Sequence, residues 1–303
     1  MVNPANISFL TRQEIINYGT AQLRSATAAP RREAELLLAH LLHCQRLSLL
    51  TYPEHALTSA EAQNYNELLR RRVAGEPLPY ITGKMEFYGL DFAVTPAVLI
   101  PRPETELLVD EALAWLDIHP CQRAVEVGTG SGCIATTLAV RAPALRLTAT
   151  DISPSALQVA RANAARHGVT GRLSFVQGDL LAPLAGPLEL LLSNPPYVAT
   201  YEWDLLPVSV REEPHIALLA GPQGLDTIHR LLAQASTRLR PGGLLLVEFG
   251  ERQGNAVRTL ARETFPAAQV EIKRDLAGRE RLLRVERVSE KARRRVSEKR
   301  VRR

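Results

Sequence analysis

The sequence has few cysteines and no long apolar run. Only three cysteines occur among 303 residues, and they are far apart in the chain: Cys44, Cys121 and Cys133. This spacing argues against both a disulfide framework and a zinc site. No apolar stretch approaches the ~20 residues needed to span a bilayer, and the N-terminus lacks the basic and apolar regions of a signal peptide. We therefore expect a cytoplasmic protein with free thiols, no metal ion and no membrane segment.

Basic residues are concentrated at one end of the chain. The formal net charge is +5, yet residues 287–303 alone hold nine basic and two acidic residues, a net charge of +7. Taking this +7 from +5 leaves −2 for residues 1–286. We expect 287–303 to be a disordered, solvated tail. The alternative is that this tail contacts RNA phosphates weakly. Nothing in residues 1–286 requires nucleic acid.

The first part of the chain has helical periodicity. Apolar residues recur at helical spacing in three runs, 11–26, 30–44 and 58–74. Thr58 and Glu61 have the spacing of a capping box, which predicts the start of the third helix. We predict a helical substrate-recognition domain over residues 1–76. Glycine, proline and aromatic residues then alternate, which predicts a hairpin-like linker over 77–102.

Strand and helix patterns alternate from residue 103 to residue 286. Helices are expected at 103–119, 132–141 and 154–167, and strands at 124–127, 145–150, 173–176, 188–192 and 244–249. A closing pair of strands is expected at 270–272 and 282–285. This alternation predicts an α/β fold with a doubly wound, Rossmann-like, mainly parallel sheet. The ligand of such a sheet binds beyond the carboxyl ends of the strands.

A glycine-rich segment follows the first of these strands. It reads Glu126-Val127-Gly128-Thr129-Gly130-Ser131-Gly132 and leads directly into a helix. Glycine lets the backbone turn sharply and approach a ligand closely. A dinucleotide-binding fingerprint would place its third glycine at position 133, which is Cys133. The glycine spacing instead resembles the first motif of class I methyltransferases, which use S-adenosylmethionine.

Two aspartates follow the next two strands. Asp151 ends the second strand, where a carboxylate can accept hydrogen bonds from ribose hydroxyls. Asp179 follows the third strand and could accept a hydrogen bond from an adenine amino group, with Leu180 packed against the ring. Each aspartate alone is as consistent with a cap or a turn. Together with the glycine-rich segment, the two aspartates make three ligand-facing features at the ends of three successive strands. This combination favours a nucleoside site.

The fourth strand ends in Asn194-Pro195-Pro196-Tyr197. Proline has no N–H and a fixed φ, so the two prolines can hold the carbonyls of Asn194 and Pro195 toward a ligand. An amide nitrogen is a poor nucleophile because its lone pair is delocalised. The Asn194 side-chain oxygen and the Pro195 carbonyl could bind its two N–H groups and leave the lone pair facing the methyl donor. Tyr197 could stack on the flat substrate. Enzymes that methylate adenine N6, cytosine N4 or glutamine share this motif, so it predicts a planar nitrogen without naming the substrate.

Further blocks resemble the release-factor glutamine methyltransferase family, and together they extend from about Pro77 to Arg284. These blocks are 79–83, 86–89, 99–106, 213–214, 217–218, 221, 224–225, 248–250, 253–254 and 275–279. The resemblance implies a substrate glutamine in the Gly-Gly-Gln motif of class I peptide-chain release factors, with the N-terminal helices helping to bind that factor. It also implies a class I methyltransferase fold.

The resemblance also assigns residues to the two sites. Those that would line the S-adenosylmethionine pocket are Gly128, Thr129, Gly130, Ser131, Gly132, Asp151, Asp179, Leu180 and Asn194. Asn194, Pro195, Pro196 and Tyr197 would hold the glutamine. Leu180 departs from the aromatic residue often found there in the family. Arg102, Glu104 and Glu106 receive no chemical step, because ion-pair or helix N-terminal roles explain them equally well.

Two other functions remain open from the residues. A methyltransferase acting on adenine or an rRNA nucleobase could use the same motif, but the net negative charge of residues 1–286 argues against it. A noncatalytic protein that merely retains the fold is disfavoured by the intact motifs at 128–132 and 194–197.

Overall fold

The computed structural model describes residues 10–121 and 123–288, which form two compact units. The first unit contains the described residues up to Lys84 together with Pro207–Glu212. The second begins at Met85 and contains the rest of the described chain. Most of the predicted tail lies outside the described residues. In the part of the chain that the structure describes, no helix has the length and apolar character to cross a membrane.

The first unit is helical. Its elements are α1 (Arg12–Leu23), α2 (Pro30–Leu41), α3 (Arg46–Thr51), α4 (Ser59–Val73), α5 (Leu78–Thr82) and α9 (Val208–Arg211). The three predicted helices correspond to α1, α2 and α4, whereas α3, α5 and α9 were not predicted. The predicted capping box at Thr58 is confirmed, since its side chain accepts from the Glu61 amide and Glu61 accepts from the Thr58 amide. Thr11 and Glu14 form a second capping box, at α1.

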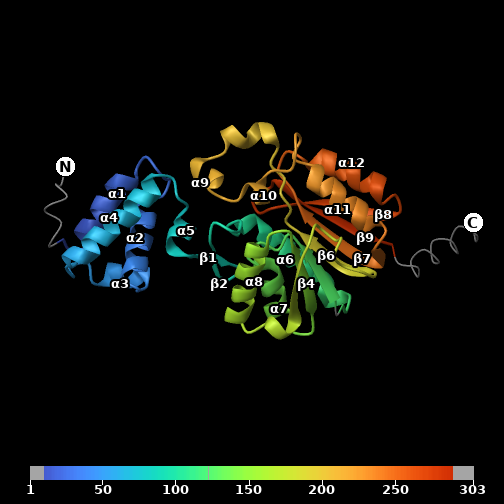
Figure 1. Ribbon diagram of the computed structural model, residues 1–303, viewed down its shortest axis with the longest axis horizontal. Helices are drawn as coiled ribbons and strands as arrows, with labels where there is room; N and C mark the ends of the chain where they lie inside the picture. The colour runs from blue at the N-terminus through green and yellow to red at the C-terminus, as the bar shows by residue number, and fades with distance from the viewer. Residues whose placement is uncertain (1–9, 122, 289–303) are drawn as a thin grey trace, which may run out of the picture. The chain divides into compact units, whose positions relative to one another are not determined.

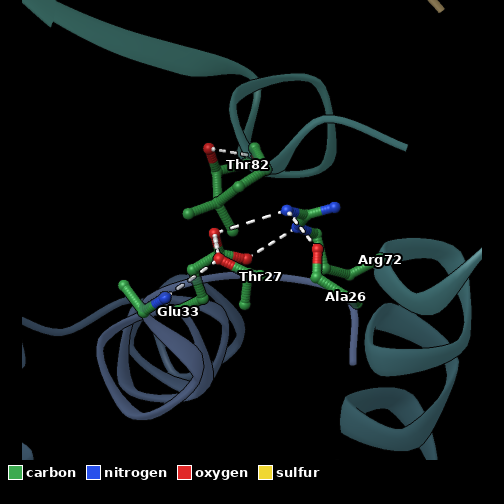
Figure 2. A network of polar contacts seen from close by, with 7 residues as sticks. Ala26, Thr27, Glu33, Arg72 and Thr82 are labelled. Atoms are coloured by element: carbon green, nitrogen blue, oxygen red, sulfur yellow. Dashed lines mark hydrogen bonds and ion pairs between the residues drawn. The ribbon is translucent and has the colours of Figure 1, made fainter. Parts of the chain in front are cut away.

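An ion pair joins two helices of this unit (Figure 2). Arg72 Nε of α4 lies 2.6 Å from Glu33 Oε2 in the first turn of α2. Thr27 Oγ1 donates to the other carboxylate oxygen over 2.6 Å, and the Arg72 guanidinium also donates to the Ala26 carbonyl. The two charged side chains are only 9% and 15% exposed. Because an unpaired charge is costly to bury, this pair favours packing in which Arg72 of α4 and Glu33 of α2 stay in contact.

The second unit is built on a large sheet with helices on both sides (Figure 1). The sheet has seven strands in the order β5-β4-β3-β6-β7-β9-β8. Its strands are β3 (Arg123–Val127), β4 (Arg146–Asp151), β5 (Leu173–Gln177), β6 (Leu188–Ser193), β7 (Leu239–Glu248), β8 (Ala268–Arg274) and β9 (Glu280–Arg287). The five strands from β5 to β7 pair in parallel, and β9 pairs antiparallel with both β7 and β8. The doubly wound fold and its closing strand pair are confirmed. A separate two-stranded sheet consists of β1 (Lys84–Phe87) and β2 (Leu90–Ala93).

Helices cover both faces of the large sheet. The helical elements are η2 (Pro103–Thr105), α6 (Glu106–Ile118), α7 (Cys133–Arg141), α8 (Pro154–Arg166), η3 (Thr170–Arg172), η4 (Thr200–Leu205), α10 (His215–Leu218), α11 (Asp226–Ser236) and α12 (Gly254–Thr264). Leu190 and Leu192 of β6 pack with α6 and α7, whereas Leu191 packs with α11 and α12 on the other face. Successive strand residues point to opposite faces, so a strand that is buried on both faces must be continuously apolar.

Candidate functional site

A cavity lies at the carboxyl ends of the parallel strands. Strands β4 and β5 follow β3 on one side of the sheet, while β6 lies on the other side of β3. The connections of the chain therefore lead away from each other on the two sides of the gap between β3 and β6. Open α/β sheets bind ligands at such a switch point. The cavity is lined by segments that follow four strands, namely 128–131, 151–153, 178–180 and 193–196. It therefore brings together most of the predicted site residues.

The glycine-rich loop is held by hydrogen bonds from the neighbouring strand. The amides of Gly128 and Thr129 both donate to the Thr150 carbonyl, over 2.9 and 3.0 Å. Gly128 and Gly130 line the cavity and have positive φ values of 72° and 53°, which favour glycine. Gly132, in contrast, is not among the described residues that line the cavity. At φ 78°, a Cβ on Gly132 would lie 3.0 Å from the Ala160 Cβ, so this glycine permits the close approach of α8.

Glu126 supports the loop from beneath. One of its carboxylate oxygens accepts from Thr129 Oγ1 over 2.8 Å and from the Ala135 amide over 3.1 Å. Glu126 is one of the residues that line the cavity, and its other oxygen is buried without a hydrogen-bond partner among the described residues. Burial raises the pKa of Glu126 to about 8. The sequence placed Glu126 at the start of the glycine-rich motif but indicated no role for it.

Asp151 is held in place by both carboxylate oxygens. Its Oδ2 accepts from the Gly130 amide and its Oδ1 from the Ser153 amide, each over 2.9 Å. Burial raises the pKa of this carboxyl, and the two amides oppose that effect. The carboxylate lines the cavity, and each oxygen retains a lone pair for a further donor.

The second aspartate has a partner that the sequence did not reveal. Asp179 forms an ion pair with Arg230 of α11, and both side chains line the cavity. Leu180, which also lines it, adopts an unusual positive φ of 52°. The Thr150 hydroxyl donates to the Leu180 carbonyl over 3.0 Å and holds this backbone in place.

Asn194 lines the cavity and carries an unpaired acceptor. Its Nδ2 donates to Thr105 Oγ1 over 3.0 Å, and Thr105 Oγ1 in turn donates to Glu248 Oε2 over 2.7 Å. The Asn194 Oδ1 is buried and has no hydrogen-bond partner among the described residues. Asn194, Pro195 and Pro196 all line the cavity. The orphaned oxygen is available to accept a hydrogen bond from a ligand.

Tyr197 is placed differently from the other three residues of its motif. It is not among the described residues that line the cavity, and its ring packs against the hydrophobic core beneath α11 and α12. Its hydroxyl donates to Glu248 Oε1 over 3.4 Å. Burial raises the pKa of Glu248 to about 7. The expected stacking of Tyr197 on a substrate thus remains a prediction.

Two residues that carry the family resemblance fix the backbone at Tyr197. Gln253 Nε2 donates to the Tyr197 carbonyl over 2.9 Å and to the Gly224 carbonyl over 3.1 Å. Gly224 has a φ of 69°, and a Cβ there would lie 2.3 Å from the Tyr197 oxygen. The segment 223–225 and the start of α12 therefore clamp the end of the Asn-Pro-Pro-Tyr loop.

Arg102 has a structural partner. It forms an ion pair with Glu213, which is 2% exposed and also accepts from the Ile100 amide over 3.0 Å. This contact fastens the segment 97–101 to the segment 214–219, and both contribute residues to the cavity wall. Glu106, at the start of α6, accepts a hydrogen bond from the Tyr88 amide over 2.8 Å. Neither residue needs a chemical step to explain its position.

Two family models match the chain. The model described as the PrmC N-terminal domain matches residues 14–83, and the model described as the methyltransferase small domain matches residues 104–206. The catalytic domain of hMettl16, solved in complex with the MAT2A 3'UTR hairpin 6, has a similar fold, with a TM-score of 0.53. That similarity covers 78% of this chain and 86% of the other at 16% identity, so it concerns the fold alone.

Similarity to curated relatives covers nearly the whole chain. The release factor glutamine methyltransferase of Nitratidesulfovibrio vulgaris is 43% identical over 287 residues, which is 93% of this chain and 97% of the relative. The protein of the same name from Moorella thermoacetica is 48% identical over 255 residues, which is 83% of this chain and 89% of the relative. With a helical unit, a doubly wound methyltransferase sheet and this level of identity, the chain belongs to the release factor glutamine methyltransferase family.

Proposed function

We propose that this enzyme transfers a methyl group from S-adenosylmethionine to the side-chain amide nitrogen, N5, of the glutamine in the Gly-Gly-Gln motif of class I peptide-chain release factors. The observation that carries this proposal is the buried, unpartnered Oδ1 of Asn194 in the cavity wall. A carboxamide nitrogen has two N–H donors and needs acceptors of this kind. Methylation of that glutamine would modulate translation termination, which takes place in the cytoplasm.

The residues after β3, β4 and β5 suit the methyl donor. When bound, S-adenosylmethionine supplies an electrophilic methyl group on a positively charged sulfur. Asp151 would accept from the ribose hydroxyls, and its existing bonds to the Gly130 and Ser153 amides hold it ready for them. Asp179 would accept from the adenine amino group and Leu180 would pack on the ring, since both line the cavity. Asp179 would then exchange or share its contact with Arg230.

The residues after β6 suit the amide. Asn194 Oδ1 and the Pro195 carbonyl would accept hydrogen bonds from the two N–H groups of the glutamine side chain. The nitrogen lone pair would then face the methyl donor. As the new N–C bond forms, the bond between the methyl carbon and the sulfur would break, its electron pair would remain on the sulfur of the departing thioether, and the nitrogen would release one proton to solvent. Catalysis by this arrangement comes from positioning and electrostatics. Pro196 has no N–H that could compete for the loop carbonyls.

The domain assignments follow from the same proposal. Residues 1–76 would recognise the release factor and 77–102 would link them to the methyltransferase domain at 103–286. The match of a distinct N-terminal family model to residues 14–83 supports a dedicated role for this region. The tail at 287–303 would add at most a weak contact with RNA.

Methyl transfer from labelled S-adenosylmethionine tests the proposal. The purified enzyme would be incubated with a class I release factor, with the same factor in which the Gly-Gly-Gln glutamine is changed to alanine, and with DNA and rRNA in parallel. We expect label on the first protein alone. Label on DNA or rRNA but on neither protein would overturn the proposed substrate in favour of a nucleobase.

A further inference from the structure

We infer that Thr105 and Glu248 form a positioning relay that fixes which end of the Asn194 amide faces the substrate. This inference rests on the proposed function, because it concerns the same amide-binding loop. Thr105 lies 89 residues from Asn194 and 143 residues from Glu248 in the sequence. The fold brings the three together from η2, from the loop after β6 and from the end of β7.

The direction of the hydrogen bonds follows from the single proton of the threonine hydroxyl. Thr105 is 2% exposed, and its hydroxyl donates to Glu248 Oε2 over 2.7 Å. An ionised Glu248 can only accept, so while it is ionised the hydroxyl gives its proton to this carboxylate and can only accept from Asn194. The group of Asn194 that lies 3.0 Å away must then be its NH2. The amide oxygen of Asn194, a residue of the cavity wall, is consequently left without a partner among the described residues.

The opposite orientation of the Asn194 amide would break two hydrogen-bonding arrangements. If Asn194 Oδ1 faced Thr105, the hydroxyl would have to donate to it, and Glu248 Oε2 would lose its donor. Glu248 is only 2% exposed, so water would not replace that donor without rearrangement. In addition, the NH2 group of Asn194 would face the N–H groups of the substrate amide, where two donors cannot bond. The relay thus selects the orientation that the proposed reaction requires.

Glu248 also contacts the other end of the loop. Its Oε1 accepts from the Tyr197 hydroxyl over 3.4 Å. The last residue of β7 therefore contacts Tyr197 directly and Asn194 through Thr105. Thr105 lies in the segment 103–106 and Glu248 in the segment 248–250. The relay therefore gives a role to two segments whose function the sequence did not indicate.

The test compares variants of the full-length enzyme that differ at one hydroxyl. Thr105→Val keeps the shape of the side chain and removes the hydroxyl, Thr105→Ala removes it with less steric demand, and Thr105→Ser retains it. Thr137→Val is the matched control, because Thr137 is a fully buried threonine of α7 whose hydroxyl has no partner among the described residues and which lies outside the cavity lining. The single-turnover rate of methyl transfer to a release factor, the Kd of S-adenosylmethionine and the Tm are measured for each.

We expect Thr105→Val and Thr105→Ala to slow transfer by roughly 10- to 100-fold, somewhat less than the loss of a direct transition-state hydrogen bond. The Kd of S-adenosylmethionine should change by less than about threefold, and Thr105→Ser should recover most of the rate. Thr137→Val should transfer at the wild-type rate. If Thr105→Val does not fold, the transfer rates of Thr105→Ala and Thr105→Ser are compared instead, because these two variants also differ in the hydroxyl. Wild-type rates in every folded variant that lacks the Thr105 hydroxyl would overturn the relay.

A double-mutant cycle separates positioning from general structural damage. If Thr105 acts through Asn194, adding Thr105→Val to Asn194→Ala should slow the residual transfer no further. Multiplicative losses in the double variant would overturn the inference. The wild-type enzyme distinguishes this failure from a failure of the proposed function. If the wild-type enzyme transferred no methyl group to any release factor, both the proposed function and the relay would be overturned. If wild-type transfer were normal and the losses multiplicative, the relay alone would be overturned.

Discussion

The side-chain amide of Asn194 is the group on which the proposed reaction depends most directly, because its nitrogen is held by Thr105 and its oxygen has no partner among the described residues. The sequence alone predicted Asn194 as the acceptor for an amide N–H, because two prolines follow it after an apolar strand. The orientation of its amide could not be predicted in this way. That orientation depends on Thr105 and Glu248, which are distant in sequence and meet Asn194 only when the sheet has formed. Arg230, the partner of Asp179, was missed for the same reason.

Replacing Asn194 by alanine removes the buried acceptor without adding bulk. We expect Asn194→Ala to lower the rate of methyl transfer by at least ~100-fold, comparable to the loss of one preorganised hydrogen-bonding group in an active site. S-adenosylmethionine should still bind, because the residues at 128–131 and 151 are unchanged. Isothermal titration and single-turnover kinetics measure the two properties separately. Turnover close to wild type would rule out positioning by this amide.

The buried carboxyl of Glu126 makes a prediction about pH. Its pKa is raised by burial to about 8, whereas an exposed glutamate titrates near 4.5. Between these values the folded protein holds a proton that the unfolded chain has lost, so the contribution of this group to stability is lost as the pH rises from about 5 to 8. One such proton changes the unfolding free energy by about 1.4 kcal/mol per pH unit.

The matched variant for this prediction is Glu126→Gln, which has no proton to release. Denaturant titrations of both proteins between pH 5 and pH 8 should show a smaller decline for the variant than for the wild type. Parallel curves would mean that Glu126 does not hold its proton in the folded state.

At the scale of elements, the apolar strands were the most predictable part of the molecule. Strands buried on both faces have continuous apolar runs, such as Leu190–Leu192 of β6 and Leu244–Val247 of β7, so these two strands could be located without the structure. Helix α11 was missed, although Ile228, Leu231, Leu232 and Ala235 have the spacing of one helix face. Apart from α11, the segment between β6 and β7 contains only short helical turns. Its conformation depends on tertiary contacts, such as the hydrogen bond from Gln253 to the Tyr197 carbonyl.

Gly224 tests whether the clamp on the Asn-Pro-Pro-Tyr loop matters. Gly224 and Gly168 share a φ of 69°, but a Cβ on Gly224 would lie 2.3 Å from the Tyr197 oxygen, while one on Gly168 would meet nothing within 4 Å. We expect Gly168→Ala to cost roughly 1–2 kcal/mol for its left-handed backbone. Gly224→Ala should cost a further ~1–3 kcal/mol from the clash and should also slow methyl transfer. Chemical denaturation and kinetics of the two variants check this, and equal effects would contradict the clamp.

The helical unit depends on the ion pair between Arg72 and Glu33. Arg72→Met should destabilise this unit by roughly 3–5 kcal/mol, because it leaves a largely buried carboxylate without its cation. Arg70→Met is the control on the same helix. Its pair with Glu67 has side chains that are 68% and 61% exposed, so it should cost less than about 1 kcal/mol. Denaturant unfolding followed by circular dichroism measures both. Similar losses in the two variants would show that the Arg72 pair has no special role.

At the scale of the whole molecule, the chain combines a helical unit with a methyltransferase sheet. The sequence predicted both parts, because helical periodicity ends near residue 77 and alternating strands and helices begin near residue 103. It did not predict that Pro207–Glu212, which lies far along the chain, groups with the helical unit. No periodic pattern marks such a short return segment, and its placement depends on tertiary contacts, for example between Gly75 and Val208. The charge distribution, with −2 over residues 1–286, suits a protein substrate better than a nucleic acid.

The most direct test of the account is to locate the methyl group on the substrate. A class I release factor would be incubated with the enzyme and S-adenosylmethionine, sampled over time, digested, and mapped by tandem mass spectrometry, with Asn194→Ala as the slow control. We expect one added methyl group on the side-chain nitrogen of the Gly-Gly-Gln glutamine, and we expect it to form at least ~100-fold more slowly with the control enzyme. A methyl group on any other residue, or the same modification at the wild-type rate with Asn194→Ala, would contradict the proposed mechanism.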